Sequence, residues 1–167
     1  KKITAITNRH LCQEDFLAQI ALLCKKGISS IILREKDMAE QEYETLAEKV
    51  MAIGKEYNTP VILHSFINVA ERLGSSAIHL PMPLFKEYME NKKRNNGSYD
   101  FKIVGVSTHT VEEAIVAEKA GATYITANHI YATDCKKDLE PKGIDYLKNV
   151  CKAVSIPVYA LGGIHFG

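Results

Sequence analysis

The chain has 167 residues, of which 46% are hydrophobic and 25% are charged, and its net charge is only +1. This composition is typical of a globular protein and excludes an intrinsically disordered chain. The near balance of 21 basic and 20 acidic residues argues against non-specific nucleic-acid binding, which needs a strong positive field. No apolar run approaches the roughly 20 residues that span a bilayer, and no signal peptide is recognised, so we expect a cytoplasmic protein.

A chain of this length can bury one core, and no Gly-, Ser- or Pro-rich linker divides it. We therefore expect a single domain over residues 1–167. The 4 cysteines and 6 histidines lack the spacing of a zinc site, so no metal site is predicted from them.

Short apolar strands alternate with amphipathic helical segments along the whole chain. In the first half, strands are predicted at 3–7, 29–35, 60–64 and 77–80, and helical segments at 14–26, 39–55, 69–73 and 84–89. In the second half, strands are predicted at 102–106, 123–127 and 157–161, and helices at 111–120 and 144–154. Gly121 is a typical stop for the helix before it.

This alternation indicates an α/β protein with parallel strands joined by right-handed helical crossovers. The strand-helix units fit a TIM (βα)₈ barrel better than an open doubly wound sheet, which usually has fewer strands. The eighth unit is absent, since few residues follow Gly163. Either the natural chain continues beyond Gly167, or the barrel is open on one side.

The segment 124–143 begins as a buried strand and becomes polar after His129. Polar loops at the carboxyl ends of parallel strands carry the chemistry of α/β enzymes. Several motifs lie at or just beyond the carboxyl ends of predicted strands. They are LREK at 33–36, IHLP at 78–81, GVSTH at 105–109, HIYATDCKK at 129–137 with LEPKG at 139–143, and GGI at 162–164.

With these motifs the chain resembles the thiamine phosphate synthase superfamily of TIM barrels, and within it most the thiazole tautomerase (TenI) branch. The resemblance covers nearly the whole length. Synthases of this superfamily carry Asn-Asp after the third strand and an Asp after the histidine of the fourth, and these carboxylates hold magnesium. Here His64-Ser65 and Leu84 stand at those positions, and Cys135 replaces a threonine that contacts pyrophosphate. Magnesium needs hard oxygen ligands, which leucine lacks.

The resemblance therefore implies a metal-free tautomerase that aromatises a carboxythiazole phosphate by general acid/base proton transfer. His129 is the predicted catalytic base, because an imidazole titrates near neutral pH and this histidine matches the tautomerase motif. The alternative role for His129 is a hydrogen-bonded residue lining the barrel mouth. His79 is expected to pack or hydrogen-bond, and His64 is a weaker candidate still.

Several residues are predicted to hold the substrate and its phosphate. They are Arg34, Lys36, Ser107, Thr133, Lys136, Gly162 and Gly163. Glycine backbone and cationic side chains both suit an anion. A tight turn explains the glycine pair equally well, and a structural salt bridge is a competing role for Arg34. The basic residues 92–94 are predicted to lie beside a solvated turn at 95–97.

Three functions thus stand after the sequence alone. The main prediction is the tautomerase, an isomerase without a cofactor. The first alternative is a thiamine phosphate synthase that joins hydroxymethylpyrimidine pyrophosphate and thiazole phosphate with release of pyrophosphate, and only this one implies Mg²⁺. The second is a non-catalytic relative that binds thiazole phosphates. The expected partner is a small phosphorylated thiazole, with neither nucleic acid nor membrane; the sequence is compatible with a homo-oligomer.

Overall fold

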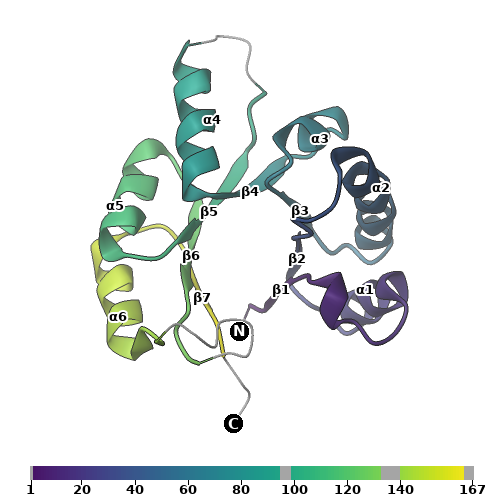
Figure 1. Cartoon of the computed structure of the whole chain (residues 1–167), viewed down its shortest axis with the longest axis horizontal. Helices are drawn as coiled ribbons and strands as arrows, with labels where there is room; N and C mark the ends of the chain where they lie inside the picture. The colour runs from purple at the N-terminus through teal and green to yellow at the C-terminus, as the bar shows by residue number, and fades with distance from the viewer. Residues whose placement is uncertain (1, 95–98, 133–139, 164–167) are drawn as a thin grey trace. The chain divides into compact units, whose positions relative to one another are not determined.

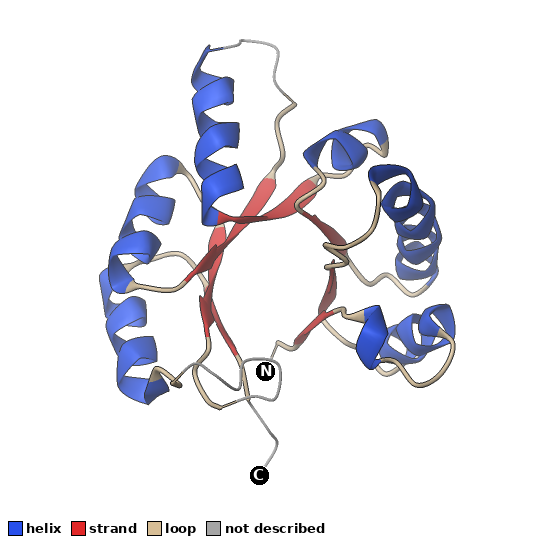
Figure 2. Ribbon diagram, in the orientation of Figure 1, coloured by secondary structure: helices blue, strands red, loops and turns tan. Residues whose placement is uncertain are grey.

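The computed structural model describes residues 2–94, 99–132 and 140–163. The chain forms two compact units, Lys1–His79 and Leu80–Gly167. In both, strands alternate with helices along the chain (Figures 1 and 2). None of the helices in the described ranges has the length and apolarity needed to span a bilayer. The prediction of one domain over the whole length stays a prediction.

The first unit is a parallel sheet whose strands follow one another in chain order. Its elements are β1 (Thr4–Ile6), the 3-10 turn η1 (Arg9–Leu11), α1 (Phe16–Lys25), β2 (Ser30–Leu33), α2 (Glu40–Glu56), β3 (Val61–His64), α3 (Ile67–Arg72) and β4 (Ala77–Pro81). β1 pairs with β2, β2 with β3 and β3 with β4, all in parallel. The predicted strand-helix alternation with parallel pairing is confirmed here.

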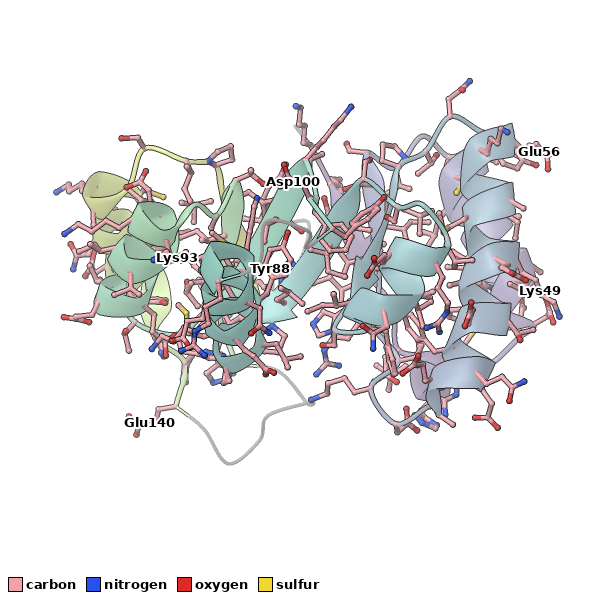
Figure 3. The ribbon with its side chains drawn as sticks, turned by 90° about the horizontal axis from the view of Figure 1, so that it is seen from above. Lys49, Glu56, Tyr88, Lys93, Asp100 and Glu140 are labelled. Atoms are coloured by element: carbon pink, nitrogen blue, oxygen red, sulfur yellow. The ribbon has the colours of Figure 1, made fainter. Side chains whose placement is uncertain are left out.

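The core of the first unit forms where apolar strand residues meet the buried stripes of the helices. Ile31, Leu33, Leu63 and Ile78 are fully buried. Helix α2 is amphipathic as its sequence predicts: it buries Tyr43, Ala47, Val50 and Gly54, while Lys49 and Glu56 are exposed (Figure 3). Apolar burial of this kind contributes most of the stability of a small domain.

Tyr43 ties α2 to the carboxyl ends of β2 and β3. Its hydroxyl donates to the Leu33 carbonyl at 2.6 Å and accepts from the backbone N–H of His64 at 3.0 Å. The ring stacks on Phe66 with centroids 4.1 Å apart. Burial raises the pKa of the Tyr43 hydroxyl, so it stays protonated and keeps both bonds. The residue thereby fixes the position at which β3 ends.

We predict that Tyr43→Phe lowers the free energy of unfolding by about 2 kcal/mol, because it removes both buried hydrogen bonds and leaves their backbone partners behind. Urea unfolding followed by circular dichroism measures the change. Tyr57→Phe is the matched control, since Tyr57 ends the same helix with an exposed ring. An equal effect of the two substitutions would contradict this role of Tyr43.

The second unit begins within β4 and contains a second run of parallel strands. Its elements are α4 (Met82–Arg94), β5 (Ile103–Thr108), α5 (Val111–Ala120), β6 (Tyr124–Asn128), α6 (Gly143–Ala153) and β7 (Val158–Leu161). β5 pairs with β6 and β6 with β7, again in parallel. Thr110 caps the start of α5 by accepting from Glu113 N–H at 3.0 Å, and Gly121 ends it at a φ of +106°.

Two elements extend at least two residues further toward the carboxyl end of the chain than predicted. Helix α4 extends to Arg94, so the basic residues 92–94 lie in its last turn, beyond the predicted end of the helix at Met89. Cations there interact favourably with the helix dipole, and Lys92 also pairs with Asp100. The solvated turn predicted at 95–97 lies outside the described residues. Strand β5 runs on through Ser107 and Thr108, because both continue the backbone pairing with β6.

The two faces of the second sheet have different compositions. Val106, Ile125 and Ala127 are fully buried on the face that α5 and α6 cover (Figure 1). The opposite face carries Gly105 and Ser107 of β5, and Tyr124, Thr126 and Asn128 of β6, because strand residues alternate between faces. Polar side chains are thus concentrated away from the helices.

Candidate functional site

Three basic side chains form a row at the carboxyl ends of β2, β3 and β4. His64 and His79 are registered partners on β3 and β4. Arg34 lies one residue beyond the registered pair Leu33 and Leu63, so it continues the row on the β2 side. Residues opposite one another on parallel strands point to the same face. The first unit therefore brings one guanidinium and two imidazoles together.

The two imidazoles of the row stack on each other and are buried. Their ring centroids are 5.4 Å apart with an interplanar angle of 19°, and the residues are 5% and 2% exposed. Burial, and after it the neighbouring His79, Arg34 and Lys36, lower the pKa of His64 to about 3. Burial and then Arg34 lower the pKa of His79 to about 4. Both rings are therefore neutral at pH 7.

The side chain of Ser65 forms a hydrogen bond with the imidazole of His64. Its Oγ lies 2.8 Å from His64 Nδ1, and its backbone N–H donates to the His79 carbonyl at 3.0 Å. Ser65 has a φ of +70°, a left-handed conformation that is costly for a residue with a Cβ. Such strain is maintained only when surrounding contacts fix it, and it is common at functional sites.

Among the residues that the structure describes, the Arg34 guanidinium forms no salt bridge. Its backbone N–H donates to Thr7 Oγ1 at 2.9 Å. The carboxylates nearby bind Arg9 instead: its Nη1 donates to Glu35 Oε2 at 3.0 Å and to Asp37 Oδ1 at 2.6 Å. Within the described parts of the chain, no acidic side chain pairs with Arg34. This leaves Arg34 able to bind an external anion, while Lys36 is exposed.

In the second unit, His129 directly follows β6. It is 4% exposed and has a φ of +66°. Its carbonyl accepts from Lys142 N–H at 2.9 Å, and Ile130 N–H donates to the Leu161 carbonyl at 3.0 Å. Residues 129 and 130 are thus fixed between the end of β7 and the start of α6. This geometry gives His129 a clear structural role beside any chemical one.

The glycine pair after β7 packs against residues 129–132. A Cβ on Gly162 would lie 3.0 Å from His129 Cα, and one on Gly163 would overlap the Ala132 carbonyl oxygen. Both glycines have positive φ. The close approach of the two backbones therefore explains why glycines occupy these positions. Their predicted role in phosphate binding stays a prediction.

Ser107 lies on the polar face of the second sheet beside its registered partner Thr126. Thr126 Oγ1 and Asn128 Oδ1 on this face are buried and have no hydrogen bond among the described residues. The predicted phosphate ligands Thr133 and Lys136 lie outside the described residues. A role for Ser107 in binding a ligand is compatible with its position and stays a prediction.

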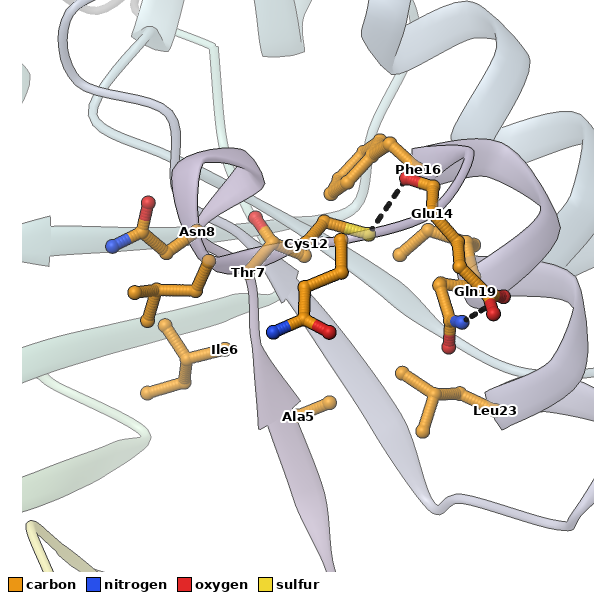
Figure 4. A pocket seen from close by; sticks show the side chains of 12 residues that line it. Ala5, Ile6, Thr7, Asn8, Cys12, Glu14, Phe16, Gln19 and Leu23 are labelled. Carbon is orange, nitrogen blue, oxygen red and sulfur yellow. Dashed lines mark hydrogen bonds between the residues drawn. The ribbon is translucent and has the colours of Figure 1, made fainter.

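A separate cleft of about 450 Å³ lies between β1, η1 and α1 (Figure 4). Cys12 and Phe16 are among its lining residues, and Cys12 Sγ donates to the Glu14 carbonyl at 3.2 Å. None of the predicted site residues lines this cleft.

The positions at which the synthase pattern has magnesium ligands do not fit that ion. Ser65 Oγ is bonded to an imidazole, and Leu84, in the first turn of α4, has no donor atom. Magnesium needs several hard oxygen ligands in octahedral geometry. Across the described ranges, no group of three His, Cys, Asp or Glu side chains is placed to hold a metal.

Comparison with known proteins identifies relatives along nearly the whole chain. It is 37% identical over 163 residues to the putative thiamine-phosphate synthase 2 of Aquifex aeolicus, covering 98% of this chain and 85% of that protein. It is 34% identical over 168 residues to the thiamine-phosphate synthase of Clostridium acetobutylicum, covering 98% and 76%. The solved thiamine phosphate pyrophosphorylase of Pyrococcus furiosus superimposes with a TM-score of 0.82 at 26% identity, covering 98% and 76%.

These relatives correct the main functional prediction. They are named as synthases, so the prediction of a thiazole tautomerase is wrong. The predicted catalytic role of His129 is not tested by them and stays a prediction. The departures at Ser65 and Leu84 are real, but they concern single positions. The identity to synthases extends along the whole sequence and outweighs them.

The same conclusion follows from the family to which the sequence conforms. A family model described as thiamine monophosphate synthase matches residues 3–166. The match contains all the strands and helices of both units. The chain therefore belongs to the thiamine monophosphate synthase family.

Proposed function

We propose that this protein is a transferase that joins hydroxymethylpyrimidine pyrophosphate to thiazole phosphate. In this reaction the bond between the pyrimidine substrate and its pyrophosphate breaks, a bond to the thiazole forms, and pyrophosphate leaves. Membership of the synthase family supports the reaction. The TIM (βα)₈ barrel also stays a proposal, supported by the alternation of strands and helices and by the likeness to the Pyrococcus furiosus structure.

The observation that carries the proposal is the unpaired Arg34 at the carboxyl end of β2. A leaving pyrophosphate accumulates negative charge as its bond breaks, and a positioned cation stabilises that charge. The planar guanidinium can bind two phosphate oxygens at once. Lys36 lies two residues further on and is exposed, so it can add a second positive charge. These groups suit the pyrophosphate-bearing substrate.

The remaining predicted ligands are assigned to the other substrate under the same proposal. Ser107, Gly162 and Gly163 belong to the second unit, together with Thr133 and Lys136. Hydroxyl, backbone and ammonium donors of this kind suit the phosphate of the thiazole. No step is assigned to a metal ion, because the described residues offer no fitting set of oxygen ligands.

We predict that the protein forms thiamine phosphate and pyrophosphate when both substrates are supplied, and that Arg34→Gln lowers kcat/KM about 100-fold, because a charged donor to the leaving group is lost. Coupled detection of pyrophosphate and chromatography of thiamine phosphate measure the reaction. Arg72→Gln is the matched control, since Arg72 pairs with Glu40 and Glu44 on the surface.

The assay also separates the proposal from the non-catalytic alternative. Binding of thiazole phosphate without formation of thiamine phosphate, in the presence and in the absence of Mg²⁺, would reject the transferase. An unchanged kcat/KM for Arg34→Gln would reject the role of the guanidinium while leaving the reaction standing.

A further inference from the structure

We propose that Thr126 and Asn128 stabilise the positive charge that forms on the thiazole nitrogen when its new bond is made. The presence of the thiazole at this place rests on the proposed function. The preference of the two side chains for a positively charged ring rests on the geometry of the second unit alone.

Thr126 and Asn128 carry buried oxygen atoms that no other described residue satisfies. The two residues are 2% and 9% exposed. Within the described ranges, neither Thr126 Oγ1 nor Asn128 Oδ1 has a hydrogen-bond partner. A buried polar atom without a partner is costly, and most such atoms in native proteins are satisfied by protein, water or a ligand. Because an amide oxygen can only accept, the missing partner of Asn128 Oδ1 is a donor or a positive charge.

The two side chains lie between residues that are assigned to the thiazole substrate. Residues two apart on a strand point to the same face and are about 7 Å apart, so one small ring can lie against both. Ser107 of β5 is the registered partner of Thr126 on this face. Leu161 of β7 is registered with Asn128 and directly precedes Gly162. Two predicted phosphate ligands, Ser107 and Gly162, therefore flank the pair.

The proposed reaction creates a cation on this ring. The lone pair of the thiazole nitrogen forms the bond to the methylene carbon of the pyrimidine substrate. The bond from that carbon to pyrophosphate breaks, and its electron pair leaves with pyrophosphate. No proton is released, because the nitrogen of an aromatic thiazole carries none. The ring therefore becomes a thiazolium with a full positive charge.

Oxygen atoms that are fixed before the reaction can stabilise this charge. Dipoles already oriented toward a developing charge act without reorganising, and they are most effective where water is excluded. The Asn128 amide oxygen and the Thr126 hydroxyl oxygen are buried and have lone pairs available. Next to Thr126 on β7 lies Tyr159, whose aromatic ring is also compatible with a neighbouring cation. This face consequently suits a thiazolium better than a neutral thiazole.

Two ligands that differ in ring charge test the proposal by titration calorimetry. Thiazole phosphate has a neutral ring, whereas its N-methyl derivative is a thiazolium with the same phosphate. The unaltered protein should bind the thiazolium roughly 10-fold more tightly. Asn128→Leu and Thr126→Val should each remove most of this preference, while the contacts to the phosphate remain common to both ligands.

Thr108→Val is the matched control for Thr126→Val. Thr108 is registered with Ala127 on the face that the helices cover, and its Oγ1 donates to the Thr126 carbonyl. The substitution removes the same hydroxyl from the opposite face, so the ratio of the two dissociation constants should not change.

Two further readouts separate this role from a structural one. Asn128 Oδ1 has no partner to lose among the described residues, so Asn128→Leu should unfold at the same or a higher urea concentration. In the synthesis of thiamine phosphate, Asn128→Leu should lower kcat about 10-fold and change the KM for thiazole phosphate by less than about 2-fold. The charge develops only after the substrate is bound, so its stabilisation affects kcat.

The proposal is overturned by equal affinities of the unaltered protein for the two ligands. It is also overturned if the preference persists in both Asn128→Leu and Thr126→Val, or if Thr108→Val removes it equally. The ratio of affinities needs no turnover, so a failure to synthesise thiamine phosphate would reject the proposed function and leave the measured preference for the thiazolium intact.

Discussion

Replacing Gly105 by Ala should lower the free energy of unfolding by about 3 kcal/mol, the upper range for inserting an atom into a packed core. The ring of Tyr124, the registered partner of Gly105 on β6, covers the place where a Cβ would be. Tyr124 is 8% exposed and meets Tyr159 edge-on, with ring centroids 5.5 Å apart. Burial and the contact with Tyr159 therefore restrict the movement of the Tyr124 ring.

A double-mutant cycle with Tyr124→Leu tests this explanation. The smaller side chain leaves room for the new methyl group, so Gly105→Ala should cost at least 1 to 2 kcal/mol less in the Tyr124→Leu background, as expected for residues in direct contact. Urea unfolding of the four proteins gives the coupling free energy. A coupling near zero would show that the loss arises from the backbone of β5 and not from the Tyr124 ring.

Much of the fold is visible in the sequence where local signals agree. Helix α5 has the predicted bounds because Thr110 caps its start and Gly121 ends it. Helix α4 was predicted too short, since its last turns are polar and carry no apolar period. Strand β5 was cut short for a related reason: Ser107 and Thr108 look like loop residues, but the pairing with β6 satisfies their backbone, and Thr108 Oγ1 donates to the Thr126 carbonyl at 3.0 Å.

The candidate site was only partly visible. Arg34 was predicted as a ligand because the motif LREK lies at the carboxyl end of a predicted strand. His64 is only a weak candidate in the sequence, because its place beside His79 depends on the register of β3 and β4. Register is a property of strand pairing and is not visible in a single segment. The left-handed backbone of Ser65 and the salt bridge between Glu35 and Arg9 also depend on the tertiary structure, so the sequence does not reveal them. The adjacent histidine and serine after β3 were the available signal, and they were interpreted only as missing metal ligands.

The functional prediction was wrong for a different reason. The substitutions at Ser65, Leu84 and Cys135 favour a tautomerase, whereas the similarity to synthases extends along the whole chain and is the stronger signal. A few polar side chains can exchange at a site while the fold and the remaining ligands persist, so such departures alter how an anion is held before they alter the reaction class.

Acidification from pH 7 to pH 5 should lower the free energy of unfolding by about 2 kcal/mol for each of His64 and His79. In the unfolded chain both titrate near pH 6.5, whereas in the folded protein their pKa values are about 3 and about 4. Between these values only the unfolded state binds the protons. Stability should therefore fall as the pH drops below about 6.5, and this loss should level off near the folded pKa values.

Urea unfolding at pH 7, 6 and 5 measures this loss, and the window avoids most of the titration of the paired carboxylates. The double variant His64→Gln/His79→Gln should show a much flatter dependence on pH, while His10→Gln, at an exposed position, should retain the dependence of the unaltered protein. NMR titration of the folded protein provides the check if the double variant unfolds: both rings should stay neutral at pH 5. Protonation of either ring near pH 6.5 in the folded state would show that Arg34 and burial do not keep the pair neutral. The pKa would then be the same in the folded and unfolded states, and the ring would contribute no pH dependence to the free energy of unfolding.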